Sequence, residues 1–189
     1  MSSTDTIVAM SRPPRARDRV LDAFEEMLIA GGERAATMDA TARAAGVSKG
    51  GLLYHFASKE ALEAGLITRL EALVDEDAAA ITTAKEGAVA HFVRTSVVAG
   101  DPLDRAMLAV SRLAQGGSAA AGSALHAARD RWADAVRPHV RNETALDLVL
   151  LVSDGLYFNN LLDPTASGPV LEGEAMDRLV GLLEHVTRD

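Results

Sequence analysis

The sequence contains no cysteine, few aromatic residues and no long apolar run. The absence of cysteine excludes disulfide bonds and cysteine-ligated metals, and it fits a reducing compartment. The N-terminal stretch lacks the apolar core of a signal peptide, and no segment is apolar over the length that a bilayer requires. We therefore expect a cytoplasmic protein without a membrane partner.

Residue patterns of the common enzyme and metal sites are also missing. The histidines are scattered without metal-ligand spacing, and the sequence has no phosphate loop, dinucleotide fingerprint or nucleophile elbow. The sequence thus predicts no catalytic residue, no metal and no cofactor.

Alanine and leucine, by contrast, are abundant. Hydrophobic residues make up 48% of the 189-residue chain and aromatic residues only 4%, which favours an all-helical protein over a sheet protein. Apolar positions recur at helical spacing in about nine segments separated by glycine, proline and capping residues. We predict an all-α fold with a flexible leader at residues 1–14, a three-helix helix-turn-helix domain at 15–62, and a larger helical domain at 63–189.

The acidic charge is unevenly distributed. The net charge is −8, but residues 1–70 carry nine Lys/Arg against nine Asp/Glu, whereas residues 71–189 carry ten against eighteen. Arg17 and its neighbouring arginines form a basic N-terminal arm suited to phosphate or minor-groove contact. The first segment can therefore bind an anionic partner despite the acidity of the whole chain.

The stretch from Thr37 to Leu62 has the pattern of a helix-turn-helix. Thr37 can cap a short helix that Gly46 ends, because glycine adopts the left-handed conformation easily. Ser48 can cap the next helix, from Lys49 to Phe56, whose apolar Leu52 and Phe56 share one face. A second helix of this kind fits the major groove of DNA.

The outer face of that second helix has few large side chains. Lys49, Gly50, Leu53 and Tyr54 are expected to face outward, and Gly50 and Gly51 would allow close approach to a phosphate backbone. Ser58 then caps a following helix, at whose start Lys59 could reach a phosphate.

These residues carry a family resemblance. Ala-Gly-Val-Ser, Lys-Gly, a Tyr-His-Phe cluster and Ser-Lys-Glu, in this order, resemble the DNA-binding domain of the TetR (tetracycline-repressor) family of transcriptional regulators, over roughly residues 17–66. Two positions depart from the pattern: Thr41 stands where isoleucine usually packs, and Leu53 where an aromatic residue often touches phosphate. By resemblance, the residues at DNA-contact positions are Thr37, Ser48, Lys49, Gly50, Tyr54, His55 and Lys59.

The second domain has features of a ligand pocket. The predicted helix from Glu143 to Leu162 contains polar residues among hydrophobic ones, and buried polar groups need partners that a small molecule can supply. A mainly apolar cavity for a small-molecule effector is predicted, lined by Phe92, Ser96, Met107, Ser111, Trp132, Asp154 and Tyr157. Trp132 can alternatively be a plain core residue, and Asp154 can face water or a partner chain.

The same helix is apolar on nearly every side, so it must be covered on every side. We predict a homodimer in which this helix and the last one, from Glu172 to Thr187, pair with their copies, as the resemblance also implies. The alternative is a central helix in a monomer. The predicted interface residues are Leu148, Leu151, Val152, Phe158, Asn159, Leu179, Leu182, Leu183 and Val186.

The resulting hypothesis is a one-component transcriptional regulator, for which the sequence favours the role of a repressor. It would bind a pseudo-palindromic duplex operator as a dimer and release it when the effector binds. The long predicted helix from Lys59 to about Thr82 would transmit the effect. The alternatives are an activator, a helical protein-interaction module that shows no salt-dependent DNA binding, and an enzyme built on the second domain.

Overall fold

The computed structural model describes residues 16–161 and 171–188, and within them the chain folds into nine α-helices and one 3₁₀ turn with no strand. The prediction of an all-α fold of about nine helices is confirmed. The proposed leader at residues 1–14 lies outside the described residues. The helices are α1 (Ala16–Ala35), α2 (Met38–Ala44), α3 (Lys49–His55), α4 (Lys59–Thr83), α5 (Ala88–Thr95), α6 (Pro102–Gln115), α7 (Ala119–Val136), α8 (Glu143–Leu161) and α9 (Gly173–Arg188), with the 3₁₀ turn at Arg137–His139.

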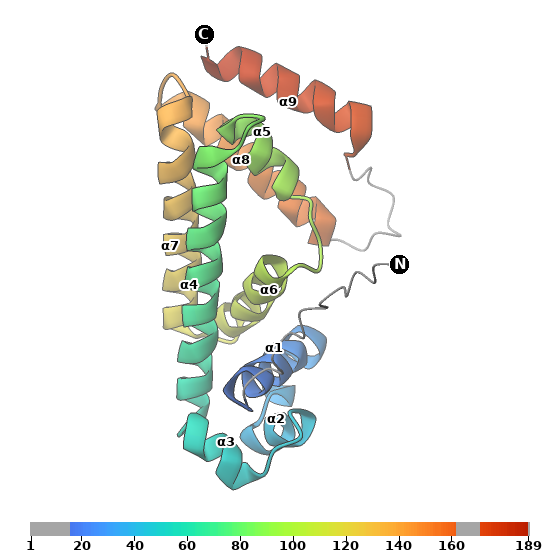
Figure 1. Ribbon diagram of the computed structural model, residues 1–189, viewed down its shortest axis with the longest axis vertical. Helices are drawn as coiled ribbons and strands as arrows, with labels where there is room; N and C mark the ends of the chain where they lie inside the picture. The colour runs from blue at the N-terminus through green and yellow to red at the C-terminus, as the bar shows by residue number, and fades with distance from the viewer. Residues whose placement is uncertain (1–15, 162–170, 189) are drawn as a thin grey trace, which may run out of the picture.

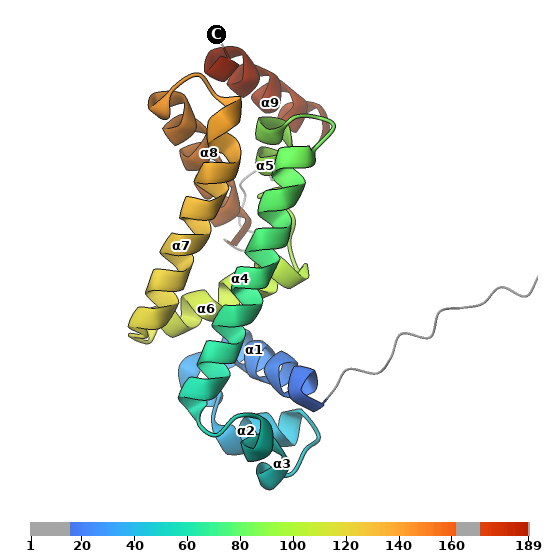
Figure 2. The same ribbon diagram turned by 60° about the vertical axis from the view of Figure 1, so that its left-hand side comes forward.

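The molecule is elongated, with α1, α2 and α3 at one end and α9 at the other (Figure 1). Helices α4 and α7 run side by side through the middle of the molecule, and α6 packs against α1, α4 and α7 (Figure 2). None of the described helices has both the length and the apolar character of a membrane span. The long α4 therefore connects the two ends of the protein directly.

Short-range capping signals begin and end the first helices as predicted. The side chains of Thr37, Ser48 and Ser58 each accept a hydrogen bond from a first-turn amide of α2, α3 and α4. Gly46, between α2 and α3, has φ 65°, in the left-handed region. Asp101 caps α6 by accepting the Asp104 amide at 2.7 Å.

Helix α1 contains a break near its end. The pair Gly31-Gly32 predicts the end of a helix, and Gly32 does leave helical geometry with φ 66° and ψ −171°. However, one further turn follows, to Ala35, and brings Ala36 into the core with no exposed surface. Glycine permits this break at little steric cost, so it bends the segment instead of ending it.

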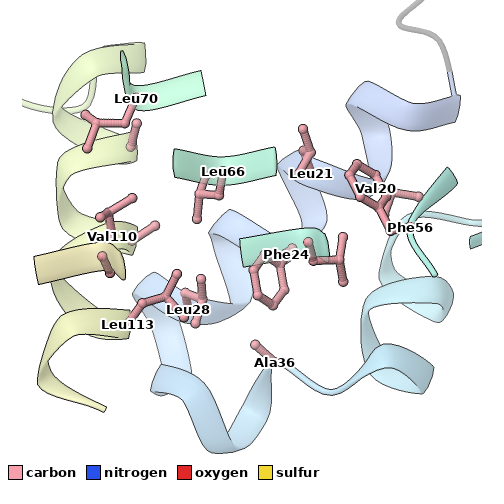
Figure 3. Close-up of a cluster of buried hydrophobic side chains, with 14 of the residues drawn as sticks. Val20, Leu21, Phe24, Leu28, Ala36, Phe56, Leu66, Leu70, Val110 and Leu113 are labelled. Carbon is pink, nitrogen blue, oxygen red and sulfur yellow. The ribbon is translucent and has the colours of Figure 1, made fainter. Parts of the chain in front are cut away.

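Two clusters of buried side chains hold the structure together. The first joins α1, α3, α4 and α6, where Phe24, Leu66 and Val110 lie close together with no solvent exposure (Figure 3). The second joins α5, α8 and α9 around Val93 and Val149. Trp132 on α7 packs against both clusters. Since α6 shares a core with α1, movement of α6 must disturb the packing of the helix-turn-helix segment.

Thr41, the residue that replaces the usual isoleucine of the family pattern, is fully buried on α2. Its hydroxyl lies 3.9 Å from the sulfur of Met27. The position therefore still packs in the core, with a weak polar contact in place of an additional methyl group.

Candidate functional site

Helix α3 presents an exposed face at the tip of the molecule (Figure 2). Leu52 is completely buried beneath it, whereas Tyr54 is 86% exposed and the Lys49 side chain 62% exposed. Gly50 is also exposed, and Leu53 is 42% exposed. The alternation of one buried anchor with outward residues leaves the N-terminal part of α3 free to enter a groove.

The cations beside this face have partners within the protein. Lys49 Nζ lies 3.0 Å from a carboxylate oxygen of Asp39 on α2, and Lys59 Nζ lies 2.6 Å from Glu33 Oε1 on α1. The Lys49 pair is largely solvent-exposed, so it contributes little to stability. Either lysine must leave or share its carboxylate to reach a phosphate.

Other residues predicted to touch DNA lie in the same end of the molecule. The Arg17 guanidinium stacks over the Phe56 ring, 5.1 Å from its centroid. The His55 ring packs edge-on against Tyr54, with centroids 5.1 Å apart. Thr37 is exposed and Gly51 is half-buried, at the starts of α2 and α3.

A cavity of about 110 Å³ lies among α4, α5, α6, α7 and α8. Six residues predicted for a ligand pocket line it; Ser111, one turn beyond Met107 on α6, is not among the lining residues. The Phe92 and Trp132 rings form one side, with centroids 6.3 Å apart. The predicted residues found in the lining are Phe92, Ser96, Met107, Trp132, Asp154 and Tyr157.

The sequence did not reveal most of the acidic groups in this cavity. Asp77, Asp101 and Asp104 line it in addition to Asp154. They were missed because an aspartate on a helix usually faces solvent, and only the packing of α4 against α6 and α7 brings these three together. One of them, Asp104, could have been anticipated from the sequence, because it lies one residue after Leu103 and three before Met107 in the hydrophobic stripe of α6.

Hydrogen bonds fix the polar lining. Trp132 Nε1 donates to Asp77 Oδ2 at 2.9 Å, and the Gly100 amide donates to Asp104 Oδ2 at 2.7 Å. Asp154 is paired with Arg129 at 3.0 Å. Burial, followed by the charge of Asp104, raises the pKa of Tyr157, so the phenol stays neutral.

An exposed apolar stripe runs along α8. Leu148, Leu151 and Phe158 are 40%, 64% and 61% exposed. Val152 is half-buried and Asn159 exposed beside them. On α9, Leu182 is 59% exposed, but Leu183 is buried in the second cluster of its own chain and so does not belong to this face. Leu179 and Val186 are half-buried at the edge.

Two short capped helices, the second anchored in the core on one side and exposed on the other, form a helix-turn-helix, the module of DNA-binding transcription regulators. Residues 20–64 match the family model described as "Bacterial regulatory proteins, tetR family". The matched residues coincide with the helix-turn-helix segment, which is therefore of the kind found in tetR-family regulatory proteins. No curated protein matches the sequence significantly.

Solved structures share the fold over nearly the whole chain. Salmonella enterica GusR is 18% identical, with a TM-score of 0.67 over 94% of this chain and 98% of that chain. A TetR family member from Streptomyces coelicolor A3 (SCO1917) is 20% identical, with a TM-score of 0.65 over 93% and 100%. The multidrug binding protein EbrR complexed with imidazole is 19% identical, with a TM-score of 0.63 over 93% and 97%. These identities establish a common fold.

Proposed function

We propose that this regulator is a repressor that binds a two-fold symmetric operator as a homodimer and releases it when a small molecule occupies the cavity. The observation that carries the proposal is the exposure of Lys49 and Tyr54 on α3, whose Leu52 anchors the helix in the core. The early residues of α3 would read base edges. Lys49, Tyr54, His55, Lys59 and Arg17 would position the helix on phosphates.

Exchange of carboxylate partners for phosphates is part of this binding. Asp39 and Glu33 hold Lys49 and Lys59 close to the surface that faces DNA. Phosphate oxygens compete with those carboxylates, and release of counterions from the duplex favours the exchange at low salt. Binding should therefore be strongly salt-dependent even though the whole chain is acidic.

The exposed stripe on α8 supports the dimer. Leu151 and Phe158 would be buried against the partner, and Gly155 lies between them on the same face with nothing within 4 Å of an added Cβ. A glycine inside a helix costs about 1 kcal/mol relative to alanine, and close approach of a partner helix accounts for its presence. The two helix-turn-helix segments of one dimer can then bind successive major grooves, about 34–36 Å apart.

The cavity supports the effector. It is mainly apolar with a few hydrogen-bonding groups, as small-molecule sites are. EbrR, which shares the fold, has been solved in complex with imidazole and with ethidium. A ligand releases DNA only if it favours a conformer in which the spacing of the two helix-turn-helix segments no longer fits the operator. Equal affinity for both conformers would shift no population.

The test begins with selection of bound sequences from a random duplex library, which should return a two-fold symmetric site. Affinity for that site is then measured against salt for the protein and for the Lys49→Ala/Lys59→Ala double variant. The slope of log K against log salt should fall by about 0.9 for each phosphate that the variant no longer neutralises.

Lys85 supplies the matched control, because it is the third lysine of the sequence and lies exposed between α4 and α5, at the far end of α4. Lys85→Ala should keep the full salt slope. An unchanged slope in the double variant, or an equal reduction in Lys85→Ala, would contradict the proposed DNA-binding surface around Lys49 and Lys59, called the reading surface below.

A further inference from the structure

The charge of the cavity lining is of one sign. Four aspartates line it, and no lysine or arginine is among the lining residues. Arg129 neutralises Asp154, but no ion pair is formed by Asp77, Asp101 or Asp104 within the described part of the chain. Three carboxylates therefore border a small apolar space without an ion pair to lysine or arginine in the described part of the chain.

Asp104 is the buried carboxylate of this lining, and its negative charge is only partly compensated by hydrogen-bond donors. It is only 8% exposed, and its Oδ1 has no hydrogen-bond partner among residues 16–161 and 171–188, although Oδ2 accepts the Gly100 amide. The buried Tyr157 hydroxyl lies close enough to the Asp104 carboxylate to interact with it, without reaching full hydrogen-bond geometry. A phenol can give one hydrogen bond to a carboxylate, but it does not balance a buried charge.

The neighbouring backbone offsets part of this charge. Asp101 and Asp104 stand at the N-terminus of α6, where the helix dipole favours anions. The capping bonds use Oδ1 of Asp101 and Oδ2 of Asp104, so Oδ1 of Asp104 is the oxygen left for another donor.

Aromatic rings complete the environment. Phe92 and Trp132 line the same space, and the Trp132 indole is held in place by its hydrogen bond to Asp77. Aromatic faces attract cations through their electron density, and the attraction is stronger where the cation is desolvated. Carboxylates and ring faces together are complementary to a positive charge attached to an apolar body.

We propose that the effector of this regulator is a small organic cation, whose charged group binds Asp104 and Asp77 and whose apolar part lies against Phe92 and Trp132. This rests on the proposed function, of which it names the ligand class. The cavity volume of about 110 Å³ is comparable to the ~150 Å³ that admits benzene in an engineered cavity, so the charge would sit on a single-ring molecule.

Three probes of similar size and different charge test this assignment. Benzylamine is a cation at neutral pH, benzyl alcohol is neutral and benzoate is an anion. Binding to the full-length protein is measured by calorimetry and by the shift in melting temperature. Because a hydrogen bond to a charged group contributes about 1.5–3 kcal/mol, benzylamine should bind at least about tenfold more tightly than benzyl alcohol. Benzoate should show no binding.

The variant Asp104→Asn keeps a carbonyl for the Gly100 amide and removes the charge. It should weaken benzylamine binding about tenfold or more and leave benzyl alcohol nearly unchanged. Asp130→Asn, on the exposed side of α7, removes the same charge elsewhere and should change neither. Equal binding of the three probes, no binding of any of them, or an unaltered affinity of Asp104→Asn for benzylamine would overturn the proposal.

These outcomes are separate from those of the DNA experiment. Duplex affinity without probe tests the reading surface, whereas probe binding without DNA tests the cavity. If benzylamine binds through Asp104 but leaves duplex affinity unchanged, the cation site stands as a binding site, and both the effector assignment and the ligand-release part of the proposed function fail.

Discussion

Glu25 on α1 and Arg105 on α6, 80 positions apart in the sequence, are joined by a hydrogen bond of 2.9 Å from Arg105 Nε to Glu25 Oε1. Arg69 on α4 lies 3.2 Å from the other oxygen of the same carboxylate. Arg105 also directly follows Asp104, which lines the cavity. The first turn of α6 thus touches the ligand space with one residue and the helix-turn-helix segment with the next.

Arg105→Ala should uncouple these two regions. The Glu25 side chain is 7% exposed, so removal of one of its two arginines leaves a buried carboxylate less well compensated. We expect the free energy of unfolding to fall by about 1–3 kcal/mol, and probe binding to release less DNA than in the unaltered protein.

The control for this variant is Arg112→Ala, which lies on the exposed side of the same helix and contacts Gln115. Urea unfolding and duplex release with and without benzylamine measure both effects. Identical release in Arg105→Ala and Arg112→Ala would argue against α6 as the connection.

Asp77 should make stability depend on pH. Burial raises its pKa; the hydrogen bond from Trp132 and the charge of His91 act to lower it, and Asp101 acts to raise it. A carboxyl with a higher pKa in the folded state binds more protons there, between its unfolded and folded pKa values. Its contribution to the free energy of unfolding therefore falls as pH rises through that window.

Asp77→Asn removes this contribution while its carbonyl can still accept the Trp132 N–H. The variant should be more stable than the unaltered protein at neutral pH, and the difference should shrink as the pH is lowered through the window. Asp75→Asn, two residues away and ion-paired with Arg131 in a more exposed position, should lack this pattern. Urea unfolding at a series of pH values makes the comparison; a pH-independent difference for Asp77→Asn would speak against the buried-charge explanation.

Substitution of Gly65 should destabilise the protein, because α4 passes close to the helix-turn-helix segment at this residue. A Cβ there would lie 2.9 Å from Phe56 Cε1 and 3.2 Å from Leu21 Cδ2, both in the buried core. Overpacking costs typically about 1–3 kcal/mol, which exceeds the roughly 1 kcal/mol that alanine gains in a helix. Gly65→Ala should thus lower the melting temperature.

Gly122 on α7 provides the opposite case, since an added Cβ there meets nothing within 4 Å. Gly122→Ala should raise the melting temperature by the gain in helix propensity alone. If both variants were stabilised equally, the close packing of α4 on Phe56 would not be the reason for glycine at position 65.

The α8 stripe should be required for association. Leu151→Glu places a charge in the centre of the proposed partner-facing surface and should convert the dimer into a monomer, as measured by sedimentation. Leu53→Glu changes another exposed leucine, on α3 at the opposite end of the molecule, and should leave the dimer intact. A Leu151→Glu protein that still sediments as a dimer would place the interface elsewhere.

The sequence predicted best what short-range chemistry determines. Thr37, Ser48 and Ser58 bond to amides three residues away, so their capping role follows from the local order of residues. The burial of Leu52 and Phe56 likewise follows from helical periodicity.

Contacts between distant segments were not predictable in this way. Lys59 was expected to be available for phosphate, and its pairing with Glu33 depends on the angle between α1 and α4. The approach of Asp77 to Trp132, 55 residues away, depends on the packing of α4 against α7. Periodicity identifies the buried side of a helix, but it does not say which helix covers that side.

The most direct measurement is the mass of the complex between the protein and its selected duplex, determined by sedimentation at low salt. Two protomers that bind one duplex through symmetric half-sites about one helical turn apart are expected. A complex that contains one protomer, or a protein that leaves the duplex free at low salt, would contradict the account.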